Sequence, residues 1–117
     1  FNGNQRRQLR SYKVDTNNNL KSHKVLHDFG PHRGIDGMAL DSDGNIVATC
    51  GWEVSGPGPM ICIFDKKGRI ILSERTPCMR PSNIAFGGKN LEDIYITSLE
   101  GHLYRVRNSG LKGNKLP

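Results

Sequence analysis

The sequence of 117 residues has few apolar residues and no long apolar run. Its hydrophobic content of 35% lies below the roughly 45–50% of typical globular chains. No run approaches the ~20 apolar residues of a membrane-spanning helix, and no segment of useful length has helical periodicity. These absences argue against a membrane partner and a helical fold. They favour a thin-cored protein of short β-strands.

Familiar catalytic motifs are also missing. The sequence contains no GxSxG nucleophile elbow, no Ser/His/Asp ordering and no glycine-rich loop that would cradle a phosphate. His23, His27 and His102 lie in strand-like segments without the spacing of metal ligands. We therefore expect these histidines to have structural or exposed positions.

Cysteine is scarce, with three residues and no CxxC pair. Cys50 and Cys62 fall in apolar strand-like runs, and Cys78 leaves the number odd. This usage predicts buried thiols in a reducing compartment, with the cytoplasm favoured, and argues against a disulfide or a zinc site.

Positive charge is in excess, with 17 basic and 11 acidic side chains and a net charge of +6. The main basic concentration, residues 6–13, contains Tyr12 as its single aromatic residue. Proteins that bind single-stranded nucleic acid usually interleave several aromatic side chains with the positive charge. We interpret the basic segment as a solvated face and expect no nucleic-acid partner; a basic nucleic-acid-binding domain would instead show steeply salt-dependent binding.

Short apolar runs separated by Gly, Asn and Asp clusters make up most of the chain. This pattern is typical of β-hairpins. The predicted strand pairs are 8–14 with 20–29, 35–40 with 46–50, 60–64 with 69–72, and 84–86 with 94–97, followed by a last strand at 102–106. Residues 51–59 are predicted to form a surface loop because they are rich in glycine and proline.

The hairpins repeat. Residues 36–40 align with 82–86 at an offset of 46, and residues 46–50 align with 94–98 at an offset of 48. Four short antiparallel strands in about 46 residues are the size of one propeller blade. The sequence therefore predicts an all-β fold, a partial β-propeller of about two and a half four-stranded blades. The predicted parts of this one domain are an outer strand pair in 1–29, a complete blade in 30–76, most of a following blade in 77–107, and a polar C-terminal tail in 108–117.

An incomplete ring needs further blades or self-assembly, because such a sheet array leaves open edges. Residue 1 is Phe rather than Met. We therefore expect a fragment or a processed chain whose missing N-terminal blades are its partners.

Propeller geometry gives Asp36 a position. The innermost strand of a blade begins at the mouth of the central channel, so Asp36 and Ser82 should lie at equivalent places on the channel mouth. The neighbouring loops place His32, Trp52 and Arg80 on the same face. We predict Ser82, His32, Trp52 and Arg80 as substrate-binding candidates, with polar loop residues and a covered blade edge as the alternatives.

Residues 33–45, RGIDGMALDSDGN, resemble the "RPDGMALDxDGN" signature of the gluconolactonase (SMP-30) family. Residues 80–88, RPSNIAFGG, are similar to its "RPTNxAFGG" element, and residues 101–106 and 110–113 resemble its C-terminal end. Two positions depart from the pattern: Ile35 replaces the usual proline, and Ser82 provides no carboxylate.

The resemblance implies a six-bladed propeller that binds one divalent cation and hydrolyses sugar lactones. Calcium is favoured, with Mg²⁺, Zn²⁺ and Mn²⁺ as alternatives. Asp36 would be a metal ligand and the general base, while a Glu and Asn ligands would come from earlier blades. Because one carboxylate cannot hold such a cation tightly, we expect residues 1–117 alone to be inactive.

Two alternatives remain open. Asp36 could be a turn residue at the start of a strand, and the propeller could be a non-catalytic interaction scaffold. The alternating oxygens of Asp41, Asp43 and Asn45 suggest a calcium loop, but the segment lacks the downstream Glu of such loops. A hairpin turn is the predicted structure there.

Overall fold

The computed structural model describes residues 7–52 and 55–115, which form nine β-strands and no helix. No helix that could cross a membrane occurs in this part of the chain. The strands are β1 Gln8–Val14, β2 Leu20–Asp28, β3 Ile35–Leu40, β4 Ile46–Trp52, β5 Ser55–Phe64, β6 Ile70–Arg75, β7 Pro81–Gly87, β8 Asp93–Ser98 and β9 Leu103–Val106.

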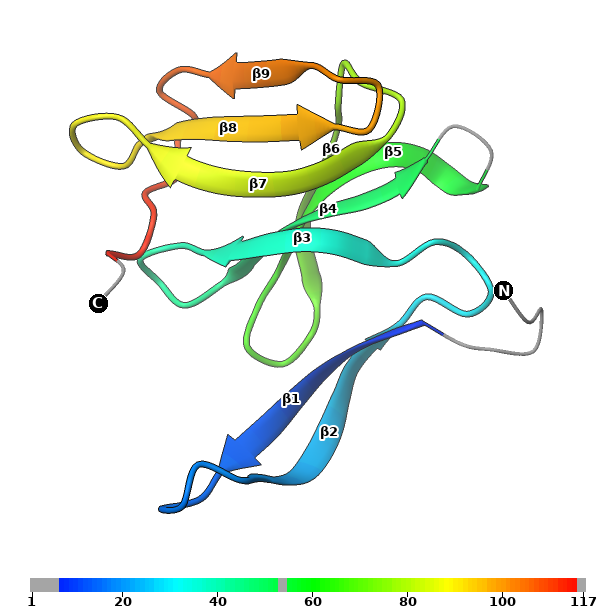
Figure 1. Cartoon of the computed structure of the whole chain (residues 1–117), viewed down its shortest axis with the longest axis vertical. Coiled ribbons are helices and arrows are strands. Elements are labelled where there is room, and N and C mark those ends of the chain that lie inside the picture. Colours follow the sequence, from blue (N-terminus) through cyan, green and yellow to red (C-terminus); the bar gives the residue numbers. More distant parts are fainter. Residues whose placement is uncertain (1–6, 53–54, 116–117) are drawn as a thin grey trace.

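The strands form three antiparallel sheets in the order of the chain (Figure 1). β1 pairs with β2, the four strands β3-β4-β5-β6 form the central sheet, and β7-β8-β9 form the third. In Figure 1 the β1–β2 hairpin lies below the central sheet and the β7–β9 sheet lies above it. The predicted all-β partial propeller is confirmed: one complete four-stranded blade lies between parts of two others.

The middle strands β4 and β5 of the central sheet are buried on both faces, whereas β6 is exposed. Neighbouring residues of a strand point to opposite faces of its sheet, so Val47 and Ala48 of β4 enter different cores. The core shared with the third sheet contains Val47, Ile63, Cys78, Ile84, Ile94 and Ile96. The core shared with the first hairpin contains Leu9, Ala48, Cys50, Cys62 and Phe64. Apolar contacts on both faces therefore hold the blades together.

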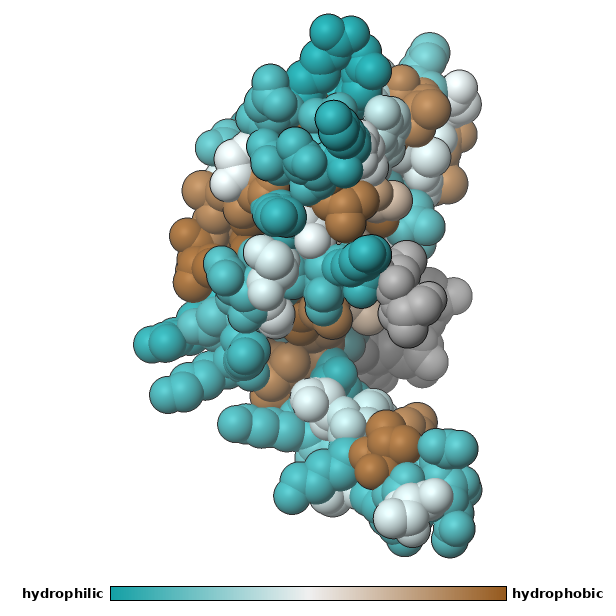
Figure 2. Space-filling view, turned by 90° about the vertical axis from the view of Figure 1, so that its left-hand side faces the viewer, coloured by the Kyte–Doolittle hydropathy of each residue, from teal (hydrophilic) through white to brown (hydrophobic). Residues whose placement is uncertain are grey.

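Three hairpin turns repeat one hydrogen-bond pattern, built on Asp15, Asp41 and Asp65. In each, the Oδ1 atom accepts hydrogen bonds from the backbone amides two and four residues later, at 2.8 or 2.9 Å. The residue three positions after each aspartate has positive φ: Asn18, Gly44 and Gly68. The predicted hairpin turn at Asp41 is confirmed. Figure 2 views the molecule from the side of the β3–β4 and β7–β8 turns, where hydrophilic surface surrounds smaller hydrophobic areas.

The predicted surface loop at residues 51–59 is wrong. β4 continues to Trp52, and β5 begins at Ser55 and includes two prolines. A register shift between Cys50 and Trp52 lets the strands remain paired, with Trp52 opposite Ser55. Gly51 has a φ of 73°, and a Cβ there would lie only 2.1 Å from the carbonyl oxygen of Gly58. The glycines thus serve a bulged strand pair, where they are common.

The segment expected as a polar tail is bound to two blades. The Ser42 amide donates to the Lys112 carbonyl at 2.7 Å, and the Asn114 amide donates to Leu40 at 3.0 Å. The Gly113 amide donates to the Leu91 carbonyl at 2.8 Å. Residues 112–114 therefore connect the β3–β4 turn with the β7–β8 turn.

Candidate functional site

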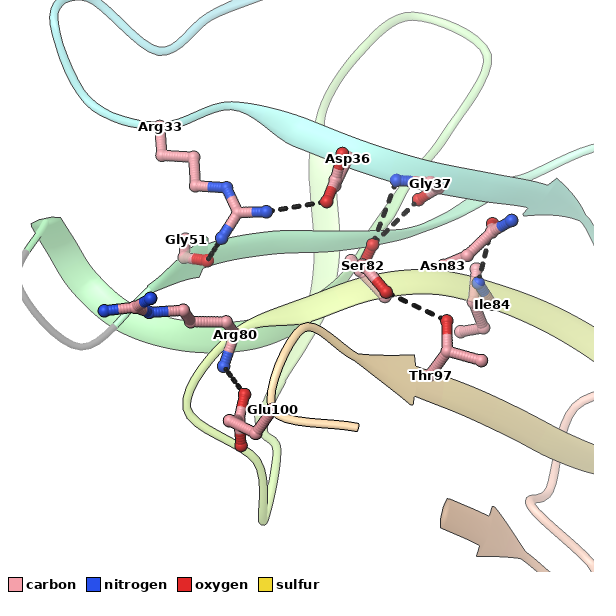
Figure 3. Close-up of polar contacts among 11 residues, drawn as sticks. Arg33, Asp36, Gly37, Gly51, Arg80, Ser82, Asn83, Ile84, Thr97 and Glu100 are labelled. Carbon is pink, nitrogen blue, oxygen red and sulfur yellow. Dashed lines mark hydrogen bonds and ion pairs between the residues drawn. The ribbon is translucent and has the colours of Figure 1, made fainter. Parts of the chain in front are cut away.

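Asp36 is the second residue of β3, and its side chain is 40% exposed. Its Oδ2 atom accepts a hydrogen bond from Nη2 of Arg33 at 2.6 Å (Figure 3). Nη1 of the same guanidinium donates to the Gly51 carbonyl at 3.5 Å, and the Arg33 side chain is only 18% exposed. The carboxylate is therefore accessible to a small molecule, while its orientation is held by a mostly buried cation.

The backbone at Asp36 is not regularly paired with β4. Ile35 pairs with Cys50 and Met38 with Ala48, so the register shifts across Asp36 and Gly37. The hydroxyl of Thr49, which is fully buried, accepts a hydrogen bond from the Gly37 amide at 3.0 Å and donates to the Gly37 carbonyl at 3.2 Å. A bulge changes the direction in which nearby side chains point. The hydrogen bonds of Thr49 hold this bulge in place.

Gly37 permits the close approach of two innermost strands. A Cβ on Gly37 would lie 2.2 Å from Oδ1 and 2.6 Å from Cα of Asn83 in β7. No other residue type fits against the Asn83 backbone at that distance. The glycine after Asp36 is therefore required by packing between blades rather than by a turn.

Ser82, the second residue of β7, has a related environment. Its Oγ lies 3.0 Å from Oγ1 of Thr97, in a hydrogen bond that either hydroxyl can donate. Thr97 of β8 pairs with Asn83 of β7. In the same way, Thr49 of β4 lies beside Gly37 of β3. Since β3 and β7 pack against each other, the structure brings the starts of the strands that carry Asp36 and Ser82 together (Figure 3).

The other predicted residues lie in flanking segments. The Arg80 amide donates to Oε1 of Glu100 at 2.7 Å, and in Figure 3 its guanidinium extends away from Ser82. His32 is exposed, and its amide donates to the Phe29 carbonyl at 3.3 Å. The backbone of Trp52 belongs to β4, but its side chain lies outside the described residues. The proposed contact of Trp52 with a substrate stays a prediction.

Sequence reasoning missed Arg33, Thr49 and Glu100. The pairing of Arg33 with Asp36 depends on the loop conformation before β3, which spacing alone does not give. Thr49 could have been found from the repeat, because Thr49 and Thr97 align within it.

Asp36 also lines a cavity of about 430 Å³ between the first hairpin and β3. Arg7, Arg10 and Phe29 contribute to its wall from the side of the hairpin. Arg7 and Arg10 make the hairpin side of this cavity positive. That side therefore favours anionic or strongly polar molecules.

The described residues do not by themselves fit a divalent cation. Residues 7–52 and 55–115 contain no group of three or more His, Cys, Asp or Glu side chains that could hold a metal ion. Calcium takes roughly six to eight oxygen ligands. Asp36 offers one carboxylate, and that carboxylate is paired with Arg33. A complete site needs ligands from elsewhere.

Comparison with known proteins assigns the family. Residues 1–100 match the family described as the SMP-30/Gluconolactonase/LRE-like region. The chain belongs to this family. The resemblance of residues 33–45 and 80–88 to its motifs is thereby confirmed.

Relatives of this family share about three residues in ten with the chain. An uncharacterized protein of Sulfolobus acidocaldarius is 30% identical over 82% of the chain and 34% of its own length. A 6-deoxy-6-sulfogluconolactonase of Pseudomonas putida is 29% identical, covering 77% of the chain and 30% of the relative. Regucalcin of Danio rerio is 29% identical over 68% of the chain and 26% of its own length. The chain thus spans about a third of the curated relatives it matches.

The fold has a solved counterpart. A luciferin-regenerating enzyme superposes with a TM-score of 0.77 and 25% sequence identity, covering 92% of this chain and 40% of that one. This likeness and the three stacked sheets both fit part of a propeller ring.

Proposed function

We propose that this chain is part of a hydrolase of sugar lactones in which Asp36 is the acid–base residue. Membership of the gluconolactonase family supports the reaction class, and one relative is named as a lactonase. The observation that carries the proposal is the placement of Asp36: an accessible carboxylate at the start of an innermost strand, beside a cavity, on a backbone held by Thr49.

The reaction opens an ester ring. Water adds to the acyl carbon, the bond from that carbon to the ring oxygen breaks, and a proton reaches the departing oxygen to give a hydroxy acid. A carboxylate positioned against the water can accept its proton and return it to the leaving oxygen. Asp36 is suited to both transfers, because the ion pair with Arg33 is made through its Oδ2 atom and its side chain is 40% exposed.

Arg33 has a positioning role in this proposal. Its contacts with Asp36 and with the Gly51 carbonyl connect the loop before β3 to the end of β4. Holding a catalytic group in one orientation avoids the entropy that a mobile side chain would lose in the transition state. The hydroxyl of Ser82 and the side chains of His32, Arg80 and Trp52 are proposed to contact the sugar.

A divalent cation, with calcium favoured and Mg²⁺, Zn²⁺ or Mn²⁺ as alternatives, would polarise the lactone carbonyl when bound. We propose that Asp36 contributes one oxygen ligand and that the remaining ligands lie in parts of the propeller outside this chain. Since one paired carboxylate binds such an ion weakly, residues 1–117 alone should lack lactonase activity.

A lactone-hydrolysis assay tests this proposal with two proteins: the product of the complete reading frame and the chain of residues 1–117. The complete protein should hydrolyse a gluconolactone at enzyme-like rates and lose that activity in a chelator, regaining it when a divalent ion is added back. The short chain should be inactive in both conditions. Chelator-insensitive turnover would contradict the cation, and an inactive complete protein would support a scaffold instead.

A further inference from the structure

A second cavity, of about 220 Å³, is bordered by three sulfur-containing side chains. They are Cys50 at the end of β4 and Met60 and Cys62 in the neighbouring strand β5. Gly51 and Gly58 also border this cavity. A Cβ at Gly58 would have no described heavy atom within 4 Å, so this side of Gly58 is not packed against neighbouring described residues.

Strand pairing places the three sulfur side chains on one face. Cys50 lies directly opposite Met60, and Cys62 lies opposite Ala48, which precedes Cys50 by two residues in β4. Cys50 and Cys62 are therefore diagonal neighbours on the same face of the sheet. Their thiols are close enough to interact, and the Cys50 thiol donates a hydrogen bond to the Ala48 carbonyl at 3.9 Å. The two sulfurs thus face each other across adjacent strands.

The surroundings of the thiols are apolar but not sealed. Cys50 is 5% exposed and Cys62 is 7% exposed, and both pack in the core that contains Phe64. The His27 ring borders the same cavity, but it stacks edge-on against Phe29 with centroids 4.5 Å apart. The third cysteine, Cys78, is 3% exposed and belongs to the other core. Only the Cys50–Cys62 pair combines mutual contact with a cavity among the described residues.

We propose that Cys50 and Cys62 form a binding site for a soft monovalent metal ion such as Cu(I), with the Met60 sulfur beside it. Thiolate and thioether sulfur are the ligands that select soft ions, whereas calcium and magnesium prefer oxygen. Two thiolates suffice for an ion of low coordination number. The site is separate from Asp36, which offers only hard oxygen donors.

Binding replaces two S–H bonds by two sulfur–metal bonds and releases two protons to water, without any change of oxidation state. The product carries one negative charge. Arg33, which lines the same cavity, supplies a positive charge near it.

Cu(I) titration under anaerobic conditions, in competition with a chromophoric Cu(I) chelator, tests the site on the purified chain. The wild type and the Cys78→Ser variant should each withdraw one equivalent of Cu(I) from the chelator. The Cys50→Ser and Cys62→Ser variants should lose this stoichiometric binding. Three results would overturn the proposal. They are a wild type that binds no Cu(I) in the assay, Cys50→Ser and Cys62→Ser variants that bind as much as the wild type, and a Cys78→Ser variant that loses binding.

A second measurement does not depend on the folding of the variants. X-ray absorption at the copper edge of the wild-type chain loaded with one equivalent should show sulfur neighbours around the metal. A first shell of nitrogen or oxygen would overturn the assignment even if one equivalent binds.

Discussion

The hydroxyl of Thr49 bonds both the amide and the carbonyl of Gly37, at 3.0 and 3.2 Å. Through this pair of bonds, a fully buried residue of β4 fixes the bulge in β3 that presents Asp36. The Thr49–Gly37 contact inside one blade therefore positions Asp36. The packing of Gly37 against Asn83 positions this strand against the next blade.

Replacing Thr49 by Val should destabilise the chain by about 1–3 kcal/mol, since the amide and carbonyl of the half-buried Gly37 would both lose their partner. Valine has nearly the same shape, so the change isolates the hydrogen bonds. Urea unfolding measures the loss. Thr97→Val is the matched control: Thr97 is exposed and, among the described residues, its hydroxyl makes an exposed hydrogen bond with the Ser82 side chain and none with a backbone group, so its effect should be smaller. Equal losses would contradict the role given to Thr49.

Gly37→Ala should destabilise the chain by about 1–3 kcal/mol, because the new Cβ would meet the Cα of Asn83 at 2.6 Å and the two blades would have to separate. Thermal unfolding measures this. The double variant Gly37→Ala/Asn83→Ala separates side chain from backbone. It should remain destabilised, since the Cα is still present; full rescue would show that the Asn83 side chain alone was the obstacle.

Stability should fall in acid because of the Asp65 turn. The backbone amide of Arg69 is the main cause that lowers the pKa of Asp65 below its ordinary value in the folded state. A depressed folded-state pKa stabilises the fold above the unfolded value of about 3.9, and this contribution disappears as the pH falls through the folded value. Melting temperatures measured from about pH 5 to about pH 2 should decline less steeply for Asp65→Asn. If the melting temperatures of the wild type and Asp65→Asn fell equally with pH, Asp65 would not be a source of the acid sensitivity.

Deleting residues 110–117 should loosen the β3–β4 turn, because the Ser42 amide donates to the Lys112 carbonyl at 2.7 Å. Amide hydrogen exchange at Ser42 should accelerate markedly in the shortened chain. The Lys67 amide, which donates to Asp65 in a different turn, is the internal control and should keep its protection. Unchanged exchange at Ser42 would mean that the C-terminal segment does not hold the turn.

Much of the fold could be predicted from the sequence because short apolar runs alternate with Asp-initiated turns. The turns at Asp15, Asp41 and Asp65 are local, and their hydrogen bonds reach only four residues along the chain. The blades were revealed by a second pattern, the alignment of residues 36–40 with 82–86 and of 46–50 with 94–98. The bulged strand pair at residues 51–59 was missed, since glycine and proline usually end strands and only pairing with β4 keeps this segment extended.

The candidate site was predictable only in part. The blade repeat placed Asp36 and Ser82 at the starts of neighbouring innermost strands, which the structure brings together. The ion pair with Arg33 and the inter-blade role of Gly37 depend on contacts between segments that local patterns do not relate. The attachment of residues 112–114 was hidden for the same reason: it uses backbone groups, which every sequence possesses.

The most direct measurement of the central claim is the turnover number of the complete protein with Asp36→Asn, which keeps the size of the side chain and removes its charge and basicity. The account predicts a loss of about a hundredfold or more in lactone hydrolysis. Asp43→Asn, at an exposed turn position, should retain wild-type turnover. Wild-type turnover by Asp36→Asn, in a protein shown to be folded, would contradict the assignment of Asp36.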